Sequence, residues 1–156
     1  MPSLLQSEGP SRADSTTRKC LGTSKLARFL LDTDTLLFSL RGNKTVLGKW
    51  AKLRADQWAI SAVSGYEIQK GIEANPSTLS SKRAALLLDQ VEFEPVTREA
   101  AILAARVHQG LKAKGIRIGV ADELLAGQAL ALGATLVTNN TKHFDRIPGL
   151  KLENWL

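Results

Sequence analysis

The stretch IGVADELLAGQALALGATLVTNNTKHFDRIPGL, residues 118–150, decides how the fold of this 156-residue chain is interpreted. Its apolar residues recur at helical spacing up to Gly133, and glycine commonly follows the last turn of a helix. The run ATLVT that comes next, residues 134–138, has the length of a buried strand, and the polar residues TNN follow it. A helix from about Ala121, a short strand and a polar turn in this order are typical of one unit of an α/β sheet.

The same alternation extends on both sides of this stretch. Strands are predicted over residues 27–32, 57–61 and 91–96 and, towards the C-terminus, over residues 151–154. Helices are predicted after Asp32, over residues 46–53, from Ser64, over residues 82–88 and from Thr97 to about Lys114. Strands that alternate with helices predict a three-layer α/β/α domain, with a mostly parallel central sheet of four to five strands.

Two local patterns give more detailed predictions. Ser64 and Glu67 have the spacing of a capping box, so the helix after the second strand is expected to begin at Ser64, with Glu67 in its first turn. In the helix that begins at Thr97, the inward-facing stripe is expected to consist of Ile102, Leu103, Arg106, Val107 and Leu111.

Composition limits the class of protein. A length of 156 residues with 44% hydrophobic and 23% charged residues suits one globular α/β domain, predicted over residues 27–156. The single cysteine, Cys20, excludes an internal disulfide and a cysteine-based zinc site. No apolar run approaches the roughly 18 residues that span a bilayer, and the first residues lack the pattern of a secretion signal. We therefore expect a cytoplasmic protein without a membrane segment.

The charge of the chain is unevenly distributed. The formal net charge is +6, and residues 1–28 hold five basic residues against two acidic ones, which leaves 16 basic and 13 acidic residues in the remainder. Residues 1–26 are rich in Ser, Thr and Gly without a hydrophobic period, so they are predicted to be a disordered extension. The excess of positive charge indicates either an ordinary solvated surface or weak attraction to a polyanion.

Four oxygen-bearing side chains are predicted at one edge of the sheet. Asp32 ends the first strand, Glu67 follows the second, Asp122 lies near the start of the helix before the fourth strand, and Asn140 follows the fourth. In open α/β sheets the binding crevice lies outside the carboxyl ends of the strands. Acids in a first helical turn also interact favourably with the helix dipole, which is a purely structural explanation for Glu67 and Asp122.

Carboxylates that converge repel one another, and a hard divalent cation relieves the repulsion. An oxygen-only ligand set suits Mg²⁺ or Mn²⁺. Such a site assists phosphodiester hydrolysis by polarising phosphate and acidifying water. The chain contains no glycine-rich phosphate loop, which argues against hydrolysis of nucleoside triphosphates.

Four stretches resemble the VapC-type toxins of the PIN-domain ribonuclease family. They are LLDTDTL (30–36), AISAVSGYEIQKGI (59–72), residues 118–150 quoted above and ENWL (153–156), which together cover roughly residues 28–156. The resemblance implies an endoribonuclease that uses Mg²⁺ or Mn²⁺ and serves as the toxin of a type II toxin–antitoxin pair. It also implies an RNA substrate, a cognate VapB-like antitoxin and a homodimer.

The resemblance also assigns roles to individual residues. The three acids of the family correspond to Asp32, Glu67 and Asp122, which would hold the metal, and the fourth catalytic position corresponds to Asn140. Thr138 resembles a supporting hydroxyl of the site. Some relatives have an acid where this chain has Asn140, and the family often has an acid at the position of His143; these departures put a second metal ion in doubt.

Several further residues have two possible interpretations. Lys114, Arg117 and His143 are candidates for contacting RNA phosphates, or else belong to a solvated surface. The tryptophans and His108 are expected in packing or surface roles rather than as base-stacking platforms or ligands. Two other functions compete with the ribonuclease: a catalytically silent PIN-like module that binds RNA or protein, and a metal-dependent phosphatase acting on small molecules.

Overall fold

The computed structural model describes residues 27–156, which form a five-stranded parallel sheet in the order β3-β2-β1-β4-β5. The strands are β1 (Phe29–Leu31), β2 (Trp58–Ser61), β3 (Phe93–Glu94), β4 (Thr135–Val137) and β5 (Lys151–Glu153). In the centre of the sheet, Leu31 of β1 pairs with Ile60 on one side and with Val137 on the other. The carboxyl ends of β1, β2 and β4 therefore meet at one edge.

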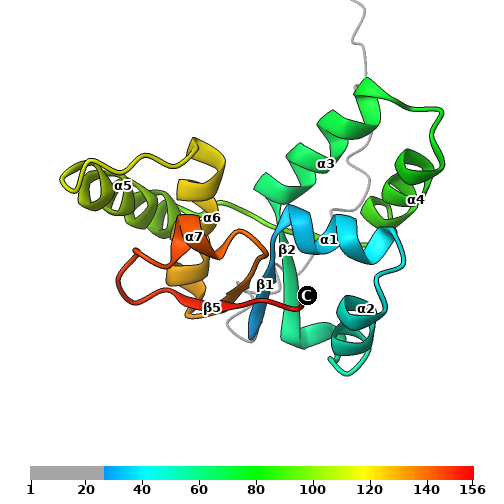
Figure 1. Ribbon diagram of the computed structural model, residues 1–156, viewed down its shortest axis with the longest axis horizontal. Coiled ribbons are helices and arrows are strands. Elements are labelled where there is room, and N and C mark those ends of the chain that lie inside the picture. The colour runs from blue at the N-terminus through cyan, green and yellow to red at the C-terminus, as the bar shows by residue number, and fades with distance from the viewer. Residues whose placement is uncertain (1–26) are drawn as a thin grey trace, which may run out of the picture.

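Helices cover both faces of the sheet (Figure 1). One layer contains α5 (Arg98–Lys112), α6 (Val120–Leu132) and α7 (Thr141–Phe144); the other contains α1 (Thr33–Leu40), α2 (Lys44–Trp50), α3 (Ala62–Ala74) and α4 (Leu79–Leu88). A short 3₁₀ turn, Ala55–Gln57, precedes β2. The predicted three-layer α/β/α fold with a parallel sheet is confirmed.

The core is divided by the sheet into two clusters of buried side chains. Leu30 packs with the α5–α6–α7 layer, whereas Phe29 and Leu31 pack with the α1–α4 layer, because successive side chains of a strand point to opposite faces. Burial on both faces explains why β1 is uniformly apolar. Among the tryptophans, Trp155 is buried edge-on against Phe29, with ring centroids 5.7 Å apart. The other two form an edge-on pair, Trp50 with Trp58.

The predicted start of α3 was wrong. The helix begins at Ala62, and Ser61 is its N-cap, whose Oγ accepts a hydrogen bond of 2.9 Å from the Val63 backbone N–H. Ser64 is fully buried inside the helix, and Glu67 consequently lies in the second turn rather than the first. The predicted capping box of Ser64 and Glu67 was therefore wrong, because Ser61 caps this helix and Glu67 lies too far along it to do so.

The predicted inner stripe of α5 was only partly correct. Val107 and Leu111 are buried as predicted, but Ile102 is 43% exposed and Arg106 is exposed too. The helix instead buries alanines, because α5 lies very close to Gly127 of α6. A Cβ atom at Gly127 would lie only 2.3 Å from the Ala100 carbonyl oxygen. Small residues, rather than the largest apolar ones, therefore define this contact.

The other helix and strand boundaries differ from the predicted ones by a few residues, and the one-turn helix α7 was not predicted. Residues 1–26, predicted to be a disordered extension, lie outside the described residues. Among the helices of residues 27–156, none combines the length and the apolar character that a membrane crossing demands.

Candidate active site

Asp32 is the central acid at the carboxyl edge of the sheet. It directly follows β1 and is the N-cap of α1, so the change from strand to helix turns its side chain into the edge. One carboxylate oxygen, Oδ1, accepts a hydrogen bond of 2.6 Å from the Thr33 backbone N–H. The other, Oδ2, accepts one of 2.7 Å from the Thr138 hydroxyl. The residue is only 7% exposed.

This burial shifts the protonation of Asp32. Burial raises its pKa from 3.8 to about 6, because removal from water disfavours the charged form. The hydrogen bonds from Thr138 and Thr33 act in the opposite direction, and the negative charges of Asp34 and Asp122 raise the pKa further. Asp122 therefore lies close enough to Asp32 for their charges to repel.

Glu67 is joined to Asp32 through Thr33. The Thr33 hydroxyl donates a hydrogen bond of 2.5 Å to Oε2 of Glu67, while the Thr33 backbone N–H donates to Asp32. One residue thus connects the start of α1 with the second turn of α3. Thr33 was not singled out from the sequence; its place directly after the strand-ending acid is the only local signal for it.

Thr138 and Asn140 approach Asp32 from the end of β4. The fully buried Thr138 donates its hydroxyl proton to Asp32, and the same oxygen accepts a hydrogen bond of 3.0 Å from the Asn140 backbone N–H. Asn140 is half-buried and occupies the N-cap position of α7. The structure thus places Thr138 directly on the central acid and Asn140 one hydrogen bond away.

Asp122 lies in the first turn of α6, as predicted, and contacts a histidine. Its Oδ2 lies 2.8 Å from Nδ1 of His143 on α7. Because an ionised carboxylate can only accept hydrogen bonds, Nδ1 carries the proton in this contact. The neighbouring residue on α6 makes a similar pair, with Glu123 Oε1 2.8 Å from His108 Nδ1. Neither pairing has a local sequence signal, since the partners are 21 and 15 residues apart.

The side chains at this edge are of the chemical kind that binds a hard divalent cation, but they do not form a closed cluster of ligands. Within residues 27–156, no three His, Cys, Asp or Glu side chains are gathered closely enough to hold a metal ion. The oxygens of Asp32 and Asp122 are instead engaged by Thr138 and His143. Carboxylates that repel at one edge, with neighbouring amide and hydroxyl oxygens, are the chemistry that Mg²⁺ and Mn²⁺ prefer.

Two of the three predicted phosphate-contacting residues lie just after the end of α5. Lys114 and Arg117 are both exposed. Lys114 also borders an apolar groove of about 390 Å³, together with Arg106 and Arg146. His143 is 47% exposed at its side chain despite its contact with Asp122. The structure thus brings His143 to an acid of the site, whereas no contact joins Lys114 or Arg117 to the acids.

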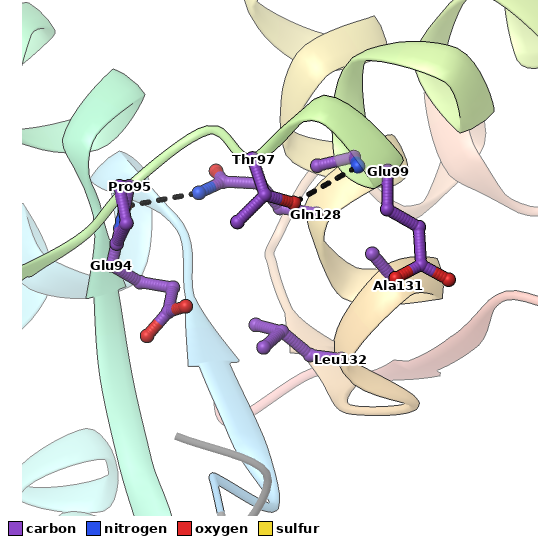
Figure 2. Close-up of a pocket in the computed structure, with 8 residues that line it drawn as sticks. Glu94, Pro95, Thr97, Glu99, Gln128, Ala131 and Leu132 are labelled. Atoms are coloured by element: carbon purple, nitrogen blue, oxygen red, sulfur yellow. Dashed lines mark hydrogen bonds between the residues drawn. The ribbon is translucent and has the colours of Figure 1, made fainter. Parts of the chain in front are cut away.

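A separate small pocket of about 90 Å³ lies between β3 and the α5–α6 pair (Figure 2). Burial raises the pKa of Glu94 in its wall. Beside it, Gln128 donates a hydrogen bond of 3.0 Å to the Glu94 carbonyl and accepts one from the Ser61 hydroxyl. This buried network ties β2 and β3 to α6. None of the four predicted active-site residues lines the pocket.

Comparison with known proteins finds similarity to one family. The PIN-domain family model matches residues 29–150. Ribonuclease VapC2 of Rickettsia felis is 31% identical over 130 residues, which cover 81% of this chain and 97% of that protein. The tRNA(fMet)-specific endonuclease VapC of Salmonella typhimurium is 28% identical, over 83% of this chain and 99% of the relative.

A solved structure shows the same fold. VapBC2 of Rickettsia felis, crystallised with a DNA fragment from its promoter, includes a chain that superposes with a TM-score of 0.75 and 29% identity. The match covers 82% of the chain described above and 98% of the Rickettsia chain. The likeness therefore extends over nearly the whole of the described domain.

Proposed function

The chain belongs to the PIN-domain family, and from this membership we propose that it is a metal-dependent endoribonuclease acting as the toxin of a type II toxin–antitoxin pair. The observation that carries the proposal is the arrangement of Asp32, Glu67 and Asp122 at one sheet edge. Thr33 links the first two acids, and repulsion from Asp122 contributes to the raised pKa of Asp32.

The acids have the chemistry to hold Mg²⁺ or Mn²⁺. When bound, such an ion supplies positive charge to a phosphate oxygen and lowers the pKa of water for attack on phosphorus. Asp32 contributes a carboxylate whose position is set by two hydrogen bonds before any ligand arrives. That preorganisation limits the entropy lost when the ion and the RNA bind.

The remaining residues are proposed to position the substrate. The amide of Asn140, anchored through its backbone to Thr138, would complete the set of oxygen ligands or orient them. Lys114 and Arg117 would contact the RNA backbone through charge, without reading its sequence. Because the proposed substrate is cellular RNA, we propose that the protein acts in the cytoplasm.

The proposed partners follow from the relatives. The similar chain of Rickettsia felis was crystallised as part of VapBC2, bound to a DNA fragment from its promoter, and we propose a VapB-like antitoxin partner for this chain. We also propose that the chain forms a homodimer. Size-exclusion chromatography with light scattering measures that state directly, and a monomer at micromolar concentration would contradict it.

The test of the function is cleavage of total RNA by the purified protein with Mg²⁺, with Mn²⁺ and with a chelator. Asp122→Asn should abolish cleavage, because a neutral amide replaces a ligand charge. Glu123→Gln is the matched control: it removes the adjacent charge on α6, which faces His108 instead. Cleavage by Asp122→Asn at the wild-type rate would contradict the assignment of the site. RNA binding without any metal-dependent cleavage would favour the silent binding module.

A further inference from the structure

His143 and Asp122 form a contact that the proposed catalytic roles do not yet use. The Nδ1–Oδ2 distance is 2.8 Å, and the side chains are 47% and 26% exposed. His143 belongs to α7, a single turn fixed to the core by the fully buried Phe144 next to it. The backbone that carries His143 is thus held in place, while the side chain remains partly exposed.

The contact leaves one carboxylate oxygen of Asp122 for another ligand. Oδ2 accepts from His143, and a carboxylate that is hydrogen-bonded at one oxygen can coordinate through the other. Carboxylates that bind metals are commonly oriented in this way by neighbouring donors. Asp122 needs such a restraint more than Asp32, which is buried and accepts hydrogen bonds at both of its oxygens.

We propose that His143 is a positioning residue for the metal site, which orients Asp122 by donating the Nδ1 proton to Oδ2. The inference rests on the proposed metal-dependent function and adds a specific role to it. Without this hydrogen bond, the partly exposed Asp122 side chain would sample several rotamers, and binding an ion would cost the entropy of selecting one.

The chain provides its own control for this role. His108 on α5 donates to Glu123 over the same 2.8 Å, with side-chain exposures of 45% and 14%. The two pairs therefore have the same chemistry and start from consecutive residues of α6. Only one of the two carboxylates belongs to the proposed metal site. Removal of either histidine should affect folding similarly, whereas metal binding should depend on His143 alone.

The experiment is calorimetric titration of the metal-free full-length protein with Mn²⁺. We expect His143→Ala to weaken Mn²⁺ binding about tenfold, within the range seen when residues supporting a metal ligand are removed. His143→Asn should restore affinity to within about threefold of wild type, since the amide Nδ2 takes the place of the ring Nδ1 as donor. His108→Ala should bind Mn²⁺ like the wild type. Melting temperatures in a chelator should agree among the variants.

Each contrary result has a distinct meaning. Unchanged or tighter binding in His143→Ala overturns the positioning role while leaving the proposed function intact. A raised KM for RNA without a change in Mn²⁺ affinity also overturns it and assigns His143 to phosphate contact. Equal weakening by His108→Ala overturns it as well, because the effect is then general to α6. A wild-type protein that binds no Mn²⁺ overturns both this role and the metal-dependent function.

Discussion

At the scale of single residues, the proposed metal ligand Asp32 illustrates how a buried charge acts against stability. The difference between its pKa of about 6 in the folded protein and the ordinary value of 3.8 corresponds to about 3 kcal/mol. The folded protein favours the protonated form of Asp32. This preference is fully available to stabilise the fold below pH 3.8, and it is lost as the pH rises through about 6 and the buried carboxylate ionises. At neutral pH the metal-free protein therefore carries an unfavourable buried charge.

Replacement of that charge should stabilise the metal-free protein. We expect Asp32→Asn to raise the free energy of unfolding by about 1–2 kcal/mol at pH 7.5, after allowing about 1 kcal/mol for one lost hydrogen bond. At pH 4.5 the gain should disappear, because the wild-type carboxyl is then mostly protonated. Denaturation in a chelator at both pH values measures this. Asp89→Asn, at an exposed position, should change stability by less than about 0.5 kcal/mol; a gain at Asp32 that is equal at both pH values would contradict the account.

We expect Asn140 to limit how many metal ions the free protein can hold. Asp32, Glu67 and Asp122 give the site a formal charge of about −3, and one divalent ion reduces it to about −1. We therefore expect one tight Mn²⁺ in the free protein, with any second ion arriving together with RNA. Asn140→Asp should add a second, weaker Mn²⁺ site in calorimetry. Two equally tight ions in the wild type would contradict this explanation of Asn140.

At the scale of helices and strands, α5 and α6 lie in close contact at Gly127. A Cβ atom at Gly127 would lie 2.6 Å from the Ala104 backbone nitrogen as well as 2.3 Å from the Ala100 oxygen. Both are backbone atoms of α5, so neither can rotate away. The start of α6, which carries Asp122, is thereby positioned through a contact made one to two turns later in the same helix.

Gly127→Ala should consequently destabilise the protein by about 3 kcal/mol or more, since relief of the overlap requires the two helices to separate. Gly110→Ala is the control within α5, because nothing lies within 4 Å of a Cβ atom there. That variant should gain up to about 1 kcal/mol from helix propensity. Thermal denaturation of both proteins measures the difference, and equal melting temperatures would show that the helices adjust without cost.

Sequence reasoning was accurate where a local pattern determines the structure. The uniformly apolar β1 and the capped start of α5 at Thr97 were both predicted, because buried parallel strands and N-caps leave signals within a few residues. The inner stripe of α5 was wrong at Ile102 and Arg106, because burial there depends on Gly127 of another helix. A pattern within one helix contains no information about so close an approach.

The same reasoning explains the outcome for the site. The positions of the strand ends predicted Asp32, Glu67 and Asp122 at one edge of the sheet. In the structure these side chains are engaged by Thr138, Thr33 and His143. Such partners come from segments that are 21 to 106 residues distant along the chain. Only the folded topology brings them together, so spacing in the sequence cannot predict them.

At the scale of the whole molecule, the sequence predicts that the core does not depend on the N-terminal arm. Residues 1–26 lie outside the described residues, and their composition lacks the periodic apolar residues of a packed element. Deletion of residues 1–24 should therefore leave the melting temperature within a few degrees of the full-length value, and Mn²⁺ binding unchanged. A fall of many degrees would show that the arm packs on the domain and that the boundary is wrong.

The proposed function also predicts an effect on growth in a living cell, and this effect should require every acid of the proposed site. Expression of the wild-type chain without a partner should arrest bacterial growth, because RNA cleavage blocks protein synthesis. Alanine at Asp32, Glu67 or Asp122 should each relieve the arrest, since a site of about −3 charge that loses one carboxylate binds a divalent ion much more weakly. Glu123→Gln should remain toxic when expressed to the same level, as measured by immunoblot. Growth arrest that persists in the triple alanine variant would instead indicate toxicity through binding, without catalysis.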